Sequence, residues 1–273
     1  MHARLVEKLK RIRSGTYVPG DFIIADAKDA EMGGGIAALG TERLTGGPER
    51  PATSSDYRQA MIDMMASGLI DIMLTSMSSA AALADSGAFN ASEVTQAIRL
   101  NDATDIWGFR GASYRKHPAL PFRTARLHHA RRLAALGLYA VTFYNDRDLD
   151  VTTLEAYGRF RQEAEKAGIA HFLEVFNPAF PIDTGRAELG AFVNDAVVRC
   201  LAGVARPEAP LFLKMQFNGA RLLEELAAYD CDMAGEGMTL SKGGEEVLTA
   251  DLLTEPGIRL VDEFFAAQFA DRL

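Results

Sequence analysis

The sequence contains only two cysteines, Cys200 and Cys231, among its 273 residues. Two cysteines without CxxC spacing do not make a disulfide framework, so a reducing cytoplasm is the expected location. No run of about 18 apolar residues is present, so no segment is expected to span a membrane. Residues 1–15 are charged and lack the apolar stretch of a signal peptide. These absences predict a cytoplasmic protein with no membrane partner.

Basic residues are not in surplus either, because the formal net charge is -8. An acidic chain without a Lys/Arg stripe is not expected to bind nucleic acid. The basic stretch at residues 123–132, "RTARLHHARR", is interpreted as the solvated face of a helix. Hydrophobic residues make up 48% of the chain, which is enough for a real core.

Several motifs of catalysis and cofactor binding are also missing. No GxGxxG follows the first apolar run, and the glycines at residues 33–35 lack that spacing. There is no GxSxG, and the five histidines show neither HxH nor HExxH spacing. We therefore expect no dinucleotide, no serine triad, no metal and no other cofactor.

What the sequence does contain is a regular alternation of short apolar runs and helical patterns. Six runs read as strands: residues 22–28, 71–76, 94–101, 139–145, 171–177 and 211–217. Helical patterns occupy residues 56–67, 79–87, 123–137, 152–168, 186–203 and 220–229. Strand and helix in repeated alternation predict parallel strands covered by helices. Six such units favour an α/β fold of the TIM-type (β/α) barrel, formed as one domain by residues 1–273.

The sixth run, "LFLKMQF", carries a lysine at its centre. Leu211, Leu213, Met215 and Phe217 alternate on one face, which should meet the helices, so Lys214 should point into the barrel. The same alternation test predicts an inward set of polar residues on the other strands. Its members are Asp26, Lys28, Arg99, Asn101, Thr142, Tyr144, Glu174 and Lys214. Most lie toward the carboxyl ends of their strands, where barrels of this kind carry their active sites.

A buried lysine amine that stays neutral for part of the time can attack a carbonyl carbon and form a Schiff base. Lys28 and Arg99 are predicted to favour the neutral amine of Lys214. Glu174 or Asp26 could then move protons, with Tyr144 as a further proton-transfer candidate. Substrate binding is assigned to Arg99, Asn101, Ser76 and Asn218. The alternative is that Lys214 and Glu174 form a buried ion pair with a purely structural role.

Three stretches, "LFLKMQFNG", "FIIADAKDAEMGGG" and "AIRLNDATDIW", resemble the class I (Schiff-base) aldolase-like barrel family. The resemblance covers roughly residues 15 to 230. It implies that Lys214 on the sixth strand forms the imine and that Asp26 is the acid of the first strand. The implied activity is that of a carbon–carbon lyase acting on a small oxo-acid or sugar, with or without a phosphate.

The C-terminal residues 231–273 depart from the family pattern. Barrels of the family continue with two further strand–helix units that bind phosphate, whereas "EGMTLSKGGEE" has polar flanks and no buried strand is evident after residue 230. Residues 258–272 are predicted to form an amphipathic helix. We therefore expect a barrel that is incomplete or remodelled after the sixth strand, with its open edge covered by this atypical segment or by a second subunit in a homo-oligomer.

Two other functions remain open from the sequence. The D-x-K pair of Asp26 and Lys28 suggests a metal-independent decarboxylase of the orotidine-monophosphate type, although Glu31 stands where that family has a second aspartate. A non-catalytic barrel that binds a sugar phosphate is the other alternative, favoured by the altered C-terminal segment. The Gly- and Pro-containing loop at residues 40–55 is either a lid over the active face or an ordinary surface connection.

Overall fold

The computed structural model describes residues 1–18, 21, 23–43, 47, 49–229, 238–242 and 246–250. Its main sheet contains six parallel strands in the order β1–β4–β5–β8–β9–β10. Their bounds are Ile23–Lys28, Ile72–Thr75, Thr95–Arg99, Leu136–Thr142, Ala170–Phe176 and Leu213–Gln216. Each of the six predicted runs overlaps one of these strands, although β8 begins three residues before its predicted run and β9 begins one residue before its own. The α/β class and the curled parallel sheet are therefore confirmed.

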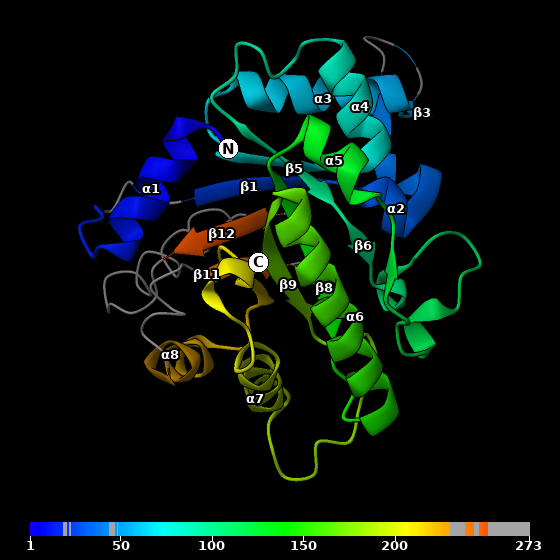
Figure 1. Ribbon diagram of the computed structural model, residues 1–273. Coiled ribbons are helices and arrows are strands. Elements are labelled where there is room, and N and C mark those ends of the chain that lie inside the picture. The colour runs from blue at the N-terminus through cyan, green and yellow to red at the C-terminus, as the bar shows by residue number, and fades with distance from the viewer. Residues whose placement is uncertain are drawn as a thin grey trace.

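Helices lie around the outside of the curled sheet (Figure 1). The α-helices are α1 Ala3–Arg13, α2 Ala30–Gly34, α3 Ser54–Ala66, α4 Met77–Asp85, α5 Leu127–Leu133, α6 Arg147–Ala167, α7 Leu189–Leu201 and α8 Ala220–Tyr229. Short 3-10 helices are η1 Gly35–Leu39, η2 Thr104–Ile106, η3 Tyr114–Lys116 and η4 Arg206–Glu208. No helix within the described part of the chain is long and apolar enough to cross a bilayer.

Helix boundaries follow local capping chemistry. The Asp146 side chain accepts hydrogen bonds from the backbone N–H groups of Asp148 and Leu149, which begins α6. Gly168 ends that helix in the left-handed conformation at φ 66°, which glycine adopts without a Cβ clash. The N-cap of α3 is Thr53, which forms a reciprocal capping box with Asp56. The helix predicted at residues 123–137 was too long at both ends, since α5 is shorter, residue 123 belongs to β7 (Phe122–Arg123) and residues 136–137 belong to β8.

Two small antiparallel sheets lie apart from the main one. Strand β6 (Asn101–Asp102) pairs with β7, and β2 (Thr41–Arg43) pairs with β3 (Glu49–Pro51). The second pair falls within the predicted 40–55 loop, of which residues 44–46 and 48 are outside the described residues. Arg50 joins this pair to α3 through ion pairs with Glu42 and Asp56. This segment is therefore a tethered hairpin in its described part.

The expectation of no strand after residue 230 was wrong. Strand β11 (Met238–Lys242) pairs in parallel with β10, and β12 (Glu246–Ala250) runs antiparallel between β11 and β1. The eight strands thus form a closed ring, in which the atypical segment itself covers the edge that six strands would leave open, as the first of the two alternatives expected. The last two strands are remodelled, because only three residues separate them and no helix fits between. The predicted helix at 258–272 lies outside the described residues.

The amino-terminal half of the barrel lumen is apolar. Inward side chains of neighbouring strands, including Ile72, Leu138, Phe172 and Phe212, pack into one cluster with Leu5, Leu9 and Ile12 of α1. Asp71, which is fully buried at the start of β4, holds α1 through ion pairs of 2.9 Å with both Arg4 and Lys8. Helix α1 therefore closes the lumen at the end opposite the carboxyl ends of the strands (Figure 1).

Candidate functional site

The carboxyl-terminal half of the lumen carries charge. Lys214 on β10 and Glu174 on β9 are register partners, and their side chains form a direct ion pair between Nζ and Oε1. The other carboxylate oxygen of Glu174 lies 3.5 Å from Nη1 of Arg99 on β5. All three side chains are buried. The prediction that Lys214, Glu174 and Arg99 converge inside the barrel is confirmed.

Arg99 has further acidic neighbours that the sequence analysis missed. Its Nη1 lies 3.0 Å from Oδ2 of Asp29, which directly follows β1, and its Nε lies 3.9 Å from Oδ1 of Asp102. Burial lowers the pKa of Arg99, but the nearby carboxylates of Asp29, Glu174 and Asp102 outweigh burial and raise it. The guanidinium group therefore stays charged. Both aspartates come just after the carboxyl end of a strand, β1 for Asp29 and β5 for Asp102. This position in the sequence could have identified them as site residues.

Three buried polar atoms in this half of the lumen form no hydrogen bond with any described residue. They are Nη2 of Arg99, Oγ1 of Thr142 and Oε2 of Glu174, the last of which still faces Nη1 of Arg99 in the 3.5 Å ion pair. Thr142 ends β8 and shares its inward face with Leu138 and Ala140. A buried polar atom without a partner loses the free energy of its hydration, on the order of 1–3 kcal/mol. Their presence in the half of the lumen that holds Lys214 marks this region as a place for polar groups from a ligand or from water.

Two predicted catalytic residues, Asp26 and Lys28, lie on the wrong face of β1 for this site. Ile23, Ala25 and Ala27 of β1 line the lumen, whereas Ile24 packs among the outer helices. By alternation Asp26 and Lys28 share the helix-facing side of β1 with Ile24.

The surroundings of this pair agree with the correction. Asp26 is the register partner of Met73, which packs with Tyr57 of α3, and its Oδ1 lies 3.5 Å from Nζ of Lys28. Burial raises the pKa of Asp26. Within the described chain no ion pair joins Asp26 or Lys28 to Arg99, Glu174 or Lys214. The prediction failed because β1 has apolar residues on both faces. The position of its charged residues therefore did not show which face of the strand points into the lumen.

Tyr144 lies just beyond the end of β8 and is held by loops. Its hydroxyl donates to Oδ2 of Asp105 at 2.9 Å and accepts from the backbone N–H of Ala119 at 2.7 Å. Burial, followed by the charge of Asp105, raises the pKa of Tyr144. Asp105 is fully buried, and burial also raises its pKa. No described contact joins Tyr144 to Lys214, so its proton-transfer role stays a prediction.

Three predicted substrate-binding residues have structural partners. Asn101 forms two hydrogen bonds with the backbone of Ala140 on β8, at 2.7 and 2.6 Å. Ser76 is the N-cap of α4 and donates to Glu31. Asn218 exchanges side-chain hydrogen bonds with Asn177 at 2.7 and 3.2 Å. These contacts explain the three residues through loop and strand packing, and only Arg99 of the predicted binding set contacts the charged lumen.

His171 faces α6 rather than the charged lumen. His171 is buried at the start of β9, with its Nε2 2.9 Å from the hydroxyl of Tyr157, and burial lowers its pKa to about 3. It is therefore a neutral core residue. Among the residues that the structure describes, no group of three His, Cys, Asp or Glu side chains has the arrangement of a metal site.

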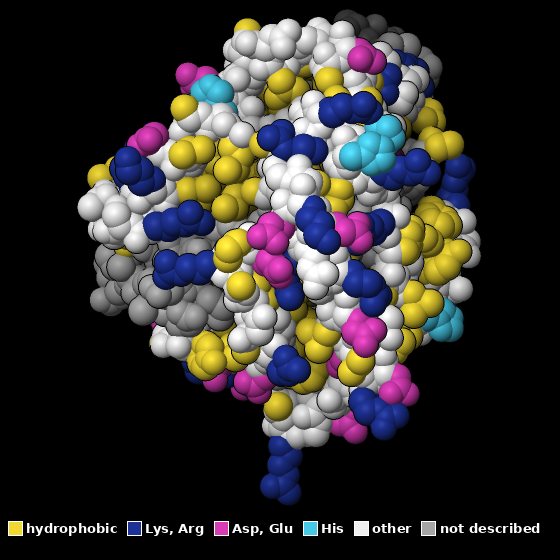
Figure 2. Space-filling view, in the orientation of Figure 1, with side chains coloured by type: hydrophobic (Ala, Val, Ile, Leu, Met, Phe, Trp, Pro, Cys, Tyr) yellow, Lys and Arg dark blue, Asp and Glu magenta, His cyan; other side chains and the backbone are white. Residues whose placement is uncertain are grey.

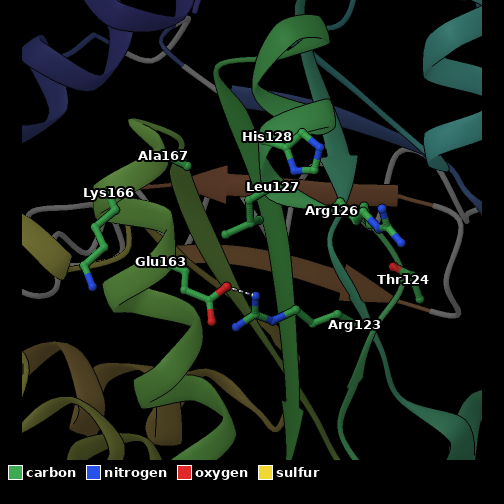
Figure 3. A pocket seen from close by; sticks show the side chains of 9 residues that line it. Arg123, Thr124, Arg126, Leu127, His128, Glu163, Lys166 and Ala167 are labelled. Carbon is green, nitrogen blue, oxygen red and sulfur yellow. Dashed lines mark hydrogen bonds and ion pairs between the residues drawn. The ribbon is translucent and has the colours of Figure 1, made fainter.

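A separate groove of about 640 Å³ lies on the outside of the barrel (Figure 3). Residues 123–128 and the C-terminal part of α6 form its walls, and Arg123 pairs across it with Glu163. The side chains of Arg126 and Lys166 lie at opposite ends of the groove in Figure 3 and do not converge. Figure 2 shows basic and acidic side chains interspersed on this face rather than gathered by sign. The groove contains none of the residues of the lumen site.

Comparison with known proteins gives a fold relationship only. No protein-family model and no curated protein matches the sequence. Among solved structures, the chain is similar to Cgl0159 of Corynebacterium glutamicum (Brevibacterium flavum), a structural-genomics target, with a TM-score of 0.51 and 18% identity. The match covers 89% of this chain and 82% of that one. At this identity the likeness supports the α/β architecture and carries no information on activity.

Proposed function

We propose that this chain is a lyase of the class I aldolase type, in which Lys214 forms a Schiff base with a small oxo-acid or sugar. The observation that carries the proposal is the buried ion pair of Lys214 and Glu174 at the carboxyl end of the lumen. An imine-forming lysine needs a proton acceptor beside its amine, and Glu174 is in direct contact. We take the ring to be a TIM-type (β/α) barrel whose last two units are replaced by β11 and β12, in a cytoplasmic protein that needs no cofactor.

The reaction begins with the transfer of one proton from Nζ of Lys214 to Glu174. The neutral amine then attacks the carbonyl carbon of the substrate and gives a carbinolamine. Glu174, now a carboxylic acid, returns the proton to the carbinolamine hydroxyl group, which leaves as water and gives the iminium ion. The neighbouring C–C bond then breaks with its electron pair moving into the iminium, while a substrate hydroxyl group loses its proton to Glu174.

Arg99 has a positioning role in this scheme. Its Nη1 holds the second oxygen of Glu174 at 3.5 Å, while Asp29 holds the same nitrogen at 3.0 Å. Glu174 is therefore fixed with one oxygen toward Lys214 and the other toward Arg99. A fixed carboxylate loses less conformational entropy when it transfers a proton in the reaction.

Two alternatives differ in what they require. A decarboxylase of the orotidine-monophosphate type requires Asp26 and Lys28 in the site, and both lie on the helix-facing side of β1. A non-catalytic sugar-phosphate-binding barrel is compatible with a Lys214–Glu174 ion pair that serves only to neutralise two buried charges. The alternatives are distinguished by whether Lys214 reacts covalently with a carbonyl compound.

Borohydride trapping tests the proposal, with Lys214→Met and Lys28→Met as matched variants. Borohydride delivers hydride to the iminium carbon and converts it to a stable secondary amine, which intact-protein mass spectrometry detects. We expect trapping of a small carbonyl compound by the wild type and by Lys28→Met, and none above background in Lys214→Met. Equal trapping in all three proteins would mean that the carbonyl compound reacts with other amines, and it would favour the non-catalytic alternative. Loss of trapping only in Lys28→Met would move the nucleophile to β1.

A further inference from the structure

The balance of charge around Lys214 bears on what kind of substrate enters the lumen. Three described carboxylates, Asp29, Asp102 and Glu174, surround two cations, Arg99 and Lys214. The cluster has a formal charge of about -1 when all five groups are ionised. Burial raises the pKa of Asp102, and protonation of that carboxyl group would bring the charge to zero. In either state these residues offer no surplus positive charge.

The buried polar atoms of the lumen that form no hydrogen bond with a described residue are a mixture of donors and acceptors. Nη2 of Arg99 can only donate a hydrogen bond, Oε2 of Glu174 can only accept one, and Oγ1 of Thr142 can do both. An alcohol group on the substrate can donate to Glu174 and accept from Arg99. A substrate carboxylate can only accept, so it would meet Oε2 of Glu174 as a second negative charge. One like-charge contact in a partly buried site disfavours binding by more than tenfold.

Arg99 does not compensate for this repulsion. In many anion sites a guanidinium group binds a carboxylate through two parallel N–H donors. Here Nη1 is directed to Asp29 and Glu174, and Nε donates to the backbone oxygen of Asn101 at 3.1 Å. Only Nη2 remains, so Arg99 cannot form the two-point contact unless Asp29 is displaced.

We infer that the compound captured by Lys214 is an uncharged hydroxy ketone or hydroxy aldehyde, with an alcohol group rather than a carboxylate next to its carbonyl carbon. The inference rests on the proposed function, and it narrows the substrate from oxo-acids and sugars to compounds of the sugar type. Asp29 is then a specificity-determining residue, because its carboxylate both occupies Nη1 of Arg99 and adds negative charge to the lumen.

Hydroxyacetone and pyruvate form a matched pair of probes. Both are methyl ketones, but hydroxyacetone has an alcohol group next to the carbonyl carbon where pyruvate has a carboxylate. We expect borohydride trapping of hydroxyacetone by the wild type to be faster than that of pyruvate by at least about tenfold. Asp29→Asn should lower this ratio by at least about fivefold, because it removes one negative charge and frees a donor of Arg99. Asp26 is about as buried as Asp29 but lies on the helix-facing side of β1. The control variant Asp26→Asn should therefore leave the ratio unchanged.

The outcomes separate the inference from the proposed function. Faster trapping of pyruvate by the wild type, or a ratio that Asp29→Asn leaves unchanged while the variant is folded by circular dichroism, overturns the inference and leaves the aldolase mechanism standing. Trapping of neither compound contradicts the mechanism. In that case, saturation-transfer NMR with the same two compounds still measures the preference: hydroxyacetone binding at least about tenfold tighter supports it, and tighter binding of pyruvate or binding of neither overturns it.

Discussion

The two halves of the barrel lumen differ in the side chains that fill them. The half near the amino ends of the strands is apolar and is closed by α1. The half near the carboxyl ends holds Lys214, Glu174 and Arg99, with three buried polar atoms that form no hydrogen bond with a described residue. Phe172 and Glu174 stand two residues apart on the same face of β9, yet one belongs to each half. One strand thus contributes an apolar side chain to the core at one end and a charged side chain to the ion-pair cluster at the other, so the two can be substituted separately.

The largest effect on stability is expected from Phe172→Ala. Phe172 is 1% exposed and stacks on Phe212 with ring centroids 4.8 Å apart. Its truncation should lower the free energy of unfolding by about 3–5 kcal/mol, because it removes buried apolar area and leaves a cavity. Urea denaturation followed by circular dichroism measures the loss. A decrease of less than about 1 kcal/mol would mean that the amino-terminal half of the lumen is not tightly packed.

Glu174→Leu should have a somewhat smaller effect of about 3 kcal/mol, by a different mechanism. The substitution leaves the cations of Lys214 and Arg99 buried without the carboxylate between them. Glu174→Leu combined with Lys214→Met should recover part of the lost stability, whereas two independent cavities would add their costs. Denaturation of the two single variants and the double variant forms the cycle that measures this coupling.

A moderate effect is expected from pH through His171, which lies outside the lumen. Burial lowers the pKa of His171 to about 3, below the value of about 6.5 in an unfolded chain. Its contribution is therefore fully present above pH 6.5 and is lost as the pH falls toward the folded-state value. Between pH 7 and pH 5 the wild type should lose about 2 kcal/mol more than His171→Gln. Parallel losses in both proteins would contradict the assignment of His171 as a neutral core residue.

The smallest change is expected from Lys214→Met, at about 1 kcal/mol or less in either direction. Methionine fills a similar volume, and Glu174 keeps its contact with Arg99 at 3.5 Å. This variant should separate the two functions of the lumen, since it should remove covalent capture while leaving the fold intact. A loss of more than about 3 kcal/mol would indicate that the lysine is a structural element first.

Two-residue alternation predicted the charged lumen well where one strand face was wholly apolar. In β10, Leu213 and Met215 mark the helix-facing side, so Lys214 was assigned inward correctly. In β1 both Ile23 and Ile24 are apolar, and the small residues Ala25 and Ala27 line the lumen, so the rule selected the wrong face for Asp26 and Lys28. Alternation fixes which residues share a face, but only packing against neighbours decides which face is inside.

The closing strands were missed for a related reason. A parallel strand buried on both faces is a near-continuous apolar run, and that was the pattern sought after residue 230. Residues 238–242 and 246–250, "MTLSK" and "EVLTA", mix apolar and polar residues and are separated by three residues of which two are glycine. Two short runs around such a spacer indicate a hairpin. Asp29 was missed because it acts from just beyond β1, outside the run that alternation covers.

The location of a reduced carbonyl adduct tests the central claim most directly, namely that the reactive amine lies in the carboxyl half of the lumen. After borohydride reduction with hydroxyacetone at low excess, the protein is digested and each lysine is assigned by tandem mass spectrometry. The account predicts a single stoichiometric modification on Lys214, although this lysine is buried and others, such as Lys10 and Lys166, are exposed to solvent. Modification spread over exposed lysines with Lys214 unmodified would contradict it.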